Sequence, residues 1–585
     1  MANFYTDNED IRFLFNHLDL KRIAAITEED FRFSKEFDIA PTNVEDAVDN
    51  YERILDTCGE IAGDMVAPTA ENTDLVGNKL EDGKVTYAPG IANAIYRLGQ
   101  ANLMGFTLPY RFGGLNCPNV VYTMSNDIVS RADAALMNIY GLQGIAETIN
   151  AFASEEIKQE YLPRMASGEW TGAMVLTEPD AGSDLQAVKT RAYQDENGNW
   201  LVRGVKRFIT NGCGEVLLVL ARTEPEISDG RGLSLLLVER GPKVKVRRLE
   251  NKLGIHGSPT CEIFFDDAPA KLIGERQRGL ITYVMSLMNG ARIGIAAQSL
   301  GIGEAAVRVA RDYAHSRKQF DVAIENFPAV RELLVNMQVD LQAARTLNYF
   351  AAYCVDLEVG PMKKLEFGNV TDKDEQKQLK QDARKFGRIN KLLTPISKYY
   401  ASEMSMRVSN DAIAVLGGSG YMKDYSLERL LRDSRITTIY EGTSQLQVVA
   451  AIAGVLSGTA EAVINDLIAK PTHMDAWPED IKPMIDEIRK GLADLIEAIN
   501  FTKGQNGMSH RDLYARKLTD MAIYLIVGAL FCDQATASQK KKSVASYWLA
   551  WRMPELRMNK ERILAANMAP VNEFDVLAGP VPVRE

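Results

Sequence analysis

The order of hydrophobic patterns along the 585 residues is the feature that most restricts how this chain can fold. Apolar residues first recur every three or four positions, which predicts helices at 47–65, 91–101 and 120–135. Short apolar runs separated by turn-forming pairs follow, and they predict strands at 199–209, 216–221, 233–238 and 261–265. Helical periodicity returns from residue 281. This α–β–α order is not the β–α alternation of a doubly wound fold.

The same patterns divide the chain into five parts. The predicted fold class is α+β and multidomain, with a central antiparallel β domain between helical domains. The last part begins after a short linker with Pro471 and Pro478, and it contains amphipathic helices at 481–499 and 512–534. The predicted boundaries are an N-terminal helical extension at 1–37, an N-terminal α domain at 38–169, the β domain at 170–280, a C-terminal α domain at 281–456 and an additional helical domain at 457–585.

Composition excludes several classes of protein. The formal net charge of -11 argues against non-specific nucleic-acid binding, because phosphates dominate that affinity. The 6 cysteines show neither close pairing nor metal-ligand spacing, and 5 histidines are few, so no metal site is predicted. The first ten residues contain no basic side chain, unlike a signal peptide, and no run of about 18 apolar residues is present. We therefore predict a cytoplasmic protein without an integral membrane segment.

One sequence string matches a cofactor-binding motif but lacks the structural setting of that motif. Gly301-x-Gly303-x-x-Ala306 matches a dinucleotide-binding fingerprint, but that fingerprint needs a preceding strand and a helix that begins within it. Here the string lies inside a long helical pattern at 293–313. Small residues that allow close helix packing explain it better.

Three loops contain residue types that could bind a ligand or catalyse a reaction. In each loop, structural reasons alone could also explain those residues. Residues 176–184 form a loop rich in hydroxyls and carboxylates, either a capped turn or a ligand-facing surface. Residues 208–212 end a predicted strand with an aromatic, a hydroxyl and an Asn-Gly turn. In the third loop, at 439–445, Thr443 or Ser444 can cap the following helix. Glu441 then either interacts with the helix dipole or acts as a general base.

Two further segments have similar alternatives. Gly417-Gly418-Ser419-Gly420 either admits a pyrophosphate or turns between helices. Arg317-Lys318 ends a helical segment, which the helix dipole alone would explain.

Taken together and in this order, the loops resemble the acyl-CoA dehydrogenase family. Thr177-Glu178-Pro179 with Gly182-Ser183-Asp184 is similar to its first signature, and Phe208-Ile209-Thr210-Asn211 to its second flavin loop. Gly417-Gly418-x-Gly420-Tyr421 followed by Tyr440-Glu441-Gly442-Thr443 is similar to its C-terminal signature. The resemblance spans about residues 60–455. The remaining ends resemble the longer subgroup of 3-methylmercaptopropionyl-CoA dehydrogenase type.

The resemblance implies a four-helix bundle at 281–456, a homodimer or dimer of dimers, FAD as cofactor and an electron-transferring flavoprotein as partner. It implies that Glu441 is the catalytic base that removes the α-proton of an acyl-CoA. It also implies that Ser183, Arg292 and Gly442 bind the substrate. Cofactor binding falls to Thr177, Ser183, Phe208, Thr210, Arg317, Phe320, Gly417, Gly418 and Thr443, with Arg317 and Phe320 reaching the FAD of a neighbouring subunit.

The sequence also departs from the family pattern. Phe208 stands where Trp is frequent, which keeps an aromatic face, and Asp321 replaces a usual Gly. Ala414 stands where Gln is frequent, so one cofactor hydrogen bond is missing or replaced. Ala291 occupies the position at which some members carry the base instead, which supports Glu441.

Three other functions remain open from sequence. An acyl-CoA oxidase would share the fold and the base but pass electrons to oxygen. A flavin-bearing DNA-binding relative is disfavoured, because Lys540-Lys541-Lys542 is the only basic run of the last module and is expected to be a solvated face. A catalytically silent scaffold is disfavoured by Glu441 and both flavin loops.

Overall fold

The computed structural model describes residues 2–368 and 370–582. The chain forms two compact units, one of Met1–Ala383 with Ala401–Gly442 and one of Arg384–Tyr400 with Thr443–Glu585. Helix α12 contributes residues to both units, and each unit is described by itself below.

The first unit begins with helices, as the periodicity predicts. The predicted helix at 120–135 is two helices, because Asp133 adopts an extended conformation and its carboxylate accepts the N–H groups of Ala135 and Leu136. The helices of this part are α1 (Glu9–His17), α2 (Leu20–Thr27), α3 (Val44–Glu60), α4 (Ala70–Val76), α5 (Pro89–Gln100), α6 (Asn119–Ala132), α7 (Ala134–Leu142), α8 (Ile145–Phe152) and α9 (Glu155–Ala166).

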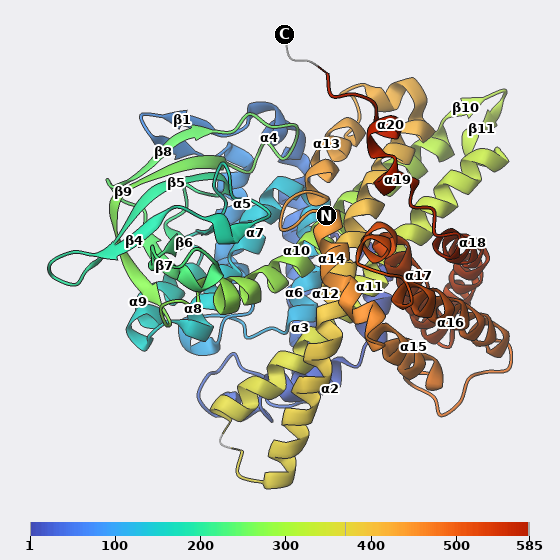
Figure 1. Ribbon diagram of the computed structural model, residues 1–585, viewed down its shortest axis with the longest axis horizontal. Helices are drawn as coiled ribbons and strands as arrows, with labels where there is room; N and C mark the ends of the chain where they lie inside the picture. Colours follow the sequence, from blue (N-terminus) through green and yellow to red (C-terminus); the bar gives the residue numbers. More distant parts are fainter. Residues whose placement is uncertain (1, 369, 583–585) are drawn as a thin grey trace. The chain divides into compact units, whose positions relative to one another are not determined.

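A seven-stranded sheet follows and is mostly antiparallel, as predicted, although β3 runs parallel to β6 (Figure 1). Strand β6 is buried on both faces, since alternate residues belong to two different apolar clusters, and this explains its uninterrupted apolar run. The strands are β3 (Gly172–Val175), β4 (Arg191–Gln194), β5 (Trp200–Thr210), β6 (Val216–Arg222), β7 (Leu233–Glu239), β8 (Val244–Leu249) and β9 (Thr260–Ile273), and a separate hairpin pairs β1 (Lys79–Glu81) with β2 (Lys84–Thr86).

Long helices complete the first unit. Helix α10 packs closely against α6: a Cβ at Gly301 would lie 2.4 Å from the backbone nitrogen of Arg131. The Gly-x-Gly string is therefore a helix-packing motif, as predicted. The elements are α10 (Met285–Ser316), β10 (Lys318–Gln319), β11 (Val322–Ala323), α11 (Pro328–Phe367), α12 (Lys373–Leu416) and α13 (Leu427–Thr437).

The N-terminal extension is tied into this unit by buried charges. The guanidinium of Arg345 on α11 is fully buried and pairs with three carboxylates. They belong to Asp127 and Glu304, and to Asp10 in the extension at 2.9 Å. A buried cation of this kind needs such partners, so the extension completes the charge balance of the helical core.

The second unit is helical. Trp548 is fully buried and meets the rings of Tyr400, Tyr524 and Phe531 edge-on. Lys541 is buried, so the prediction that the basic run is a solvated face is wrong for this residue, whereas Lys542 pairs with the exposed Asp480. Besides part of α12, the helices of the second unit are α14 (Ser444–Leu456), α15 (Thr459–Ala469), α16 (Lys482–Lys503), α17 (Ser509–Ala535), α18 (Gln539–Leu564), α19 (Ala569–Asn572) and α20 (Phe574–Ala578).

By length and composition alone, Gly279–Ser316 and Ser509–Ala535 could each cross a membrane, and the bent pair α14–α15 could form a third span. In Ser509–Ala535, 89% of the most apolar stretch is buried inside the protein, as expected for a core helix. The corresponding share in Gly279–Ser316 is 39%.

Candidate active site

The loop that carries Glu441 has a special backbone conformation. Glu441 is left-handed with φ 53°, and Gly442 follows with φ 90°. A non-glycine residue pays about 1–2 kcal/mol for this region, so its surroundings must hold it there. Thr443 caps α14 through its hydroxyl, which accepts the N–H of Leu446, as predicted.

Arg292 lies near enough to this carboxylate to be affected by its charge. It lies on α10, half-buried, and its Nη1 donates to Oδ1 of Asn289 at 3.2 Å. Burial lowers the pKa of Arg292, and the charge of Glu441 acts in the opposite direction. Its Nε is buried without a hydrogen-bond partner among the described residues. Arg292 therefore lies within electrostatic range of Glu441 and keeps one buried donor, Nε, without a partner among the described residues. The preceding residue is Ala291, which carries no titratable group.

The loop that carries Thr177 and Ser183 is anchored by Glu178, a role that the sequence did not reveal. The carboxylate of Glu178 is buried against Lys206 at 3.0 Å, and it accepts the N–H groups of Lys189 and Thr190. With Glu178 facing inward, Thr177 is half-exposed and Ser183 is exposed.

The loop that carries Phe208 and Thr210 ends β5 at an irregularity in the pairing with β9. Phe208 is left-handed with φ 62°, and its ring is 51% exposed. Asn211 is also left-handed and fully buried, and its side chain bonds to Tyr87, Thr171 and Gly172. A strained backbone that displays an aromatic ring above a fixed turn is typical of a binding surface.

The loop that carries Thr177 and the loop that carries Phe208 lie side by side. The backbone N–H of Arg207 donates to the carbonyl oxygen of Thr177 at 3.0 Å. An exposed aromatic ring next to half-exposed threonine hydroxyls suits a flat heterocycle with polar edges, so these residues fit the flavin of FAD. The loop of Thr177 and the loop of Phe208 and Thr210, which are separate motifs in the sequence, thus form one surface.

A third group of predicted residues lies on a hairpin and a glycine loop. Phe320 and Asp321 connect β10 and β11, and positive φ at both makes a turn that favours glycine or asparagine. Phe320 is 90% exposed at this tip, and Arg317 is exposed at its base. Such an exposed aromatic ring on a strained turn suits a contact with another molecule.

The glycine loop lies close to the end of α10. The hydroxyl of Tyr313 donates a hydrogen bond to Oγ of Ser419 at 3.2 Å. Gly417 has φ 59°, and a Cβ on Gly417 or Gly418 would meet no atom within 4 Å. The backbone here is therefore open to close approach by a ligand. Ala414, one turn earlier on α12, is exposed.

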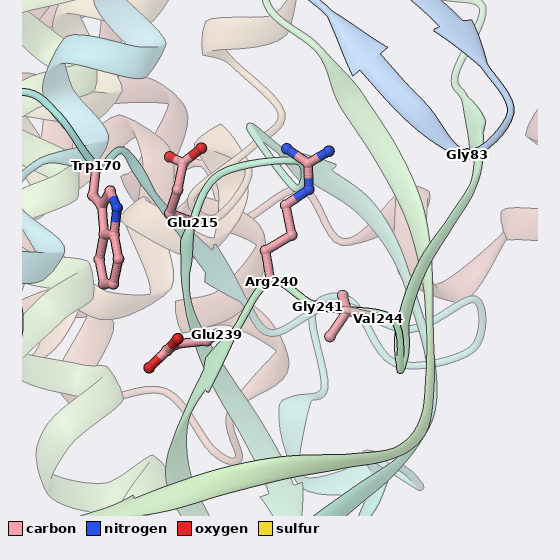
Figure 2. Close-up of a pocket in the computed structure, with 7 residues that line it drawn as sticks. All are labelled: Gly83, Trp170, Glu215, Glu239, Arg240, Gly241 and Val244. Carbon is pink, nitrogen blue, oxygen red and sulfur yellow. The ribbon is translucent and has the colours of Figure 1, made fainter.

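A pocket lies elsewhere, in the β domain (Figure 2). Its volume is about 390 Å³, and it is lined by Gly83, Trp170, Glu215, Glu239, Arg240, Gly241 and Val244. Its charged groups already have partners within the protein. Glu215 accepts the N–H of Thr171, Glu239 accepts the hydroxyl of Tyr161, and Arg240 donates to the carbonyl of Cys213. None of the residues predicted from the sequence lines it.

Known proteins resemble this chain over the same regions. Residues 49–169, 173–268, and 278–366 with 377–456 match the acyl-CoA dehydrogenase N-terminal, middle and C-terminal domains, respectively. An acyl-CoA dehydrogenase of Bacillus subtilis (strain 168) is 37% identical over 373 residues, which are 62% of this chain and 90% of that protein.

Two longer relatives extend the comparison. The 3-methylmercaptopropionyl-CoA dehydrogenase of Ruegeria pomeroyi is 31% identical over 432 residues, which are 68% of this chain and 69% of that protein. A crystal structure of an acyl-CoA dehydrogenase complexed with FAD, from Bacillus anthracis, covers 92% of both chains with a TM-score of 0.74 and 22% identity, which shows a shared fold. Three matched domains and these relatives establish that this chain belongs to the acyl-CoA dehydrogenase family, whose members are FAD-dependent oxidoreductases.

Proposed function

We propose that this enzyme removes hydrogen from the α- and β-carbons of an acyl-CoA thioester to give the trans-2-enoyl-CoA, with Glu441 as the base. The observation that carries the proposal is the left-handed backbone of Glu441, whose carboxylate lies within electrostatic range of the half-buried Arg292. Strained backbone and buried charge concentrate at functional sites.

The chemistry suits these residue types. The α-proton of a thioester is weakly acidic, so its removal needs a positioned carboxylate and stabilisation of the negative charge that develops on the thioester oxygen. Glu441 takes the proton, and main-chain N–H groups of its loop, with Gly442, are placed to polarise the thioester carbonyl. Ser183 contacts the pantetheine or acyl part, and Arg292 holds Glu441 and the substrate in the same pocket through charge.

FAD, when bound, accepts the hydride that leaves the β-carbon. Thr177 and Thr210 would hold the flavin ring by hydrogen bonds, Phe208 would pack against it, and Ser183 and Thr443 would complete the cofactor contacts. Arg317 and Phe320 would reach the FAD of a second copy, and Gly417 and Gly418 would meet its pyrophosphate. The enzyme is thus a homodimer or a dimer of dimers in the cytoplasm.

The electron acceptor is proposed to be an electron-transferring flavoprotein. The alternative is an acyl-CoA oxidase, and formation of peroxide at the rate of turnover would establish it. Salt-sensitive retention of duplex DNA would revive the DNA-binding alternative.

The decisive experiment is anaerobic bleaching of the yellow protein by a panel of short, long, branched, aromatic and thioether-containing acyl-CoAs. Wild-type protein bleaches with its substrate, whereas Glu441→Gln keeps FAD and does not bleach. Normal bleaching of Glu441→Gln would refute the assigned base.

A further inference from the structure

The residue before the proposed base is held by two helices. The phenolic oxygen of Tyr440 lies 3.0 Å from Oδ1 of Asn138 on α7, and it also contacts Oε1 of Gln298 on α10. Asn138 and Gln298 are buried, and Tyr440 is half-buried. A side chain fixed in this way restricts the backbone of the next residue, which is Glu441.

The directions of these hydrogen bonds follow from the partners of Gln298. Its Nε2 donates to the carbonyl oxygen of Ala134 at 2.8 Å and to Oδ1 of Asn138 at 2.9 Å. The amide oxygen of Gln298 therefore faces Tyr440, whose hydroxyl must be the donor. Burial, and then the charge of Glu441, raise the pKa of Tyr440, so the phenol keeps the proton it donates.

The group spans three parts of the sequence. Asn138 donates from Nδ2 to the hydroxyl of Ser258 at 3.4 Å, and Ser258 precedes β9. The matched N-terminal, middle and C-terminal family domains thus each contribute at least one member, with Gln298 and Tyr440 both in the last. The group can form only when these three parts have assembled.

We propose that Tyr440, Asn138 and Gln298 are positioning residues that hold Glu441 in its left-handed conformation and aim its carboxylate at the α-proton. The proposal rests on the proposed function. Catalysis is sensitive to such aiming, since a misplacement of about 1 Å can cost roughly 100-fold in rate. Removal of the phenolic hydroxyl leaves the carboxylate and its charge in place and changes only how well it is held.

The test separates proton removal from the rest of the reaction. A 3-thiaacyl-CoA has sulfur in place of the β-carbon, so it has no hydride to lose, but its α-protons can still exchange with deuterium from D₂O. Incorporation of deuterium, followed by mass spectrometry on the FAD-loaded enzyme, therefore reports the base alone. The acyl length is the one that bleaches wild-type protein best.

Tyr440→Phe is expected to slow α-exchange and kcat by about 10- to 100-fold, with KM, bound FAD and the unfolding midpoint close to wild type. Asn138→Ala is the second variant and should act in the same direction. The matched control is Tyr514→Phe, which removes a phenolic hydrogen bond to the carbonyl of Asn567 and should leave exchange unchanged.

Three outcomes are distinct. If Tyr440→Phe and Asn138→Ala exchange within twofold of wild type, positioning is refuted, and a loss of stability alone would assign the group a structural role. If wild type exchanges, Glu441→Gln does not and Tyr440→Phe is slow, both proposals hold. If Glu441→Gln exchanges like wild type, the proposed base itself is wrong.

Discussion

The ammonium nitrogen of Lys206 lies 3.0 Å from Oε1 of Glu178, in an ion pair almost closed to solvent. The same nitrogen donates to the carbonyl of Leu176 at 2.7 Å. Burial lowers the pKa of Lys206 to about 8, against the opposing effect of Glu178. Burial alone would raise the pKa of Glu178, but Lys206 and the neighbouring N–H groups bring it below its usual value. Both groups are charged at neutral pH, and the pair fixes the loop of Thr177 to β5.

Lys206→Met should destabilise the protein by about 3–5 kcal/mol, because it leaves a buried carboxylate without its cation. The free energy of unfolding in urea measures this, and FAD retained after gel filtration should fall as the loop loosens. The control is Lys189→Met: its ion pair with Asp180 is exposed, so we expect a change of less than about 0.5 kcal/mol. Equal effects of the two substitutions would contradict this account.

Glu28→Gln should make stability less dependent on pH. Burial raises the pKa of Glu28 to about 7, although hydrogen bonds from Tyr110 and Asn116 oppose this. The ordinary value is about 4.3, so between these values the folded state binds more protons than the unfolded state. Ionisation of Glu28 therefore lowers the free energy of unfolding as the pH rises from about 4 to about 7. The full decrease is reached above that pH.

At pH 8 the Glu28→Gln variant should accordingly be more stable than wild type by up to about 3 kcal/mol, and near pH 5 by much less. Unfolding midpoints at the two pH values measure the difference. Glu36→Gln, at an exposed position in the same extension, is the control and should not alter the pH dependence. A constant difference between Glu28→Gln and wild type across pH would count against a buried, protonated Glu28.

Gly301→Ala should weaken the packing of α10 on α6. The new Cβ would lie 2.4 Å from the nitrogen of Arg131 and 2.5 Å from the carbonyl oxygen of Asp127. These are backbone atoms, so the helices must separate, at a cost of about 1–3 kcal/mol. Gly290→Ala on the same helix meets nothing within 4 Å and should be neutral or slightly stabilising in urea unfolding. A neutral Gly301→Ala would show that the helix contact is looser than described.

Phe320→Ala should leave the unfolding midpoint unchanged and reduce FAD retention. The side chain is 90% exposed, so it contributes little to the fold, but the proposed function places it on the cofactor of a second copy. Leu75→Ala, at a position 77% exposed, is the control and should alter neither quantity. Full FAD retention by Phe320→Ala would remove the hairpin from the proposed cofactor site.

The sequence predicted the order of helices and strands well, because the periodicity of apolar residues reports which faces are buried. It placed the strand at 216–221 and the capping role of Thr443 correctly. It could not reveal that Glu178 faces Lys206 or that Tyr440 faces Gln298, since those partners are distant in sequence and only the fold brings them together. The burial of Lys541 was missed because a basic run has no periodicity of its own.

The ion pair between Asp10 and Arg345 also has a consequence for how the chain folds. The two residues are 335 positions apart, and Asp127 and Glu304 meet the same guanidinium. The carboxylate of Asp10 on α1 therefore gains its partner only when α11 has reached its place in the fold. Contacts of such long range are slow to form, and exposed apolar helices are prone to aggregate meanwhile. The docking of α1 is therefore expected late in folding, after α6, α10 and α11 have come together around the guanidinium of Arg345.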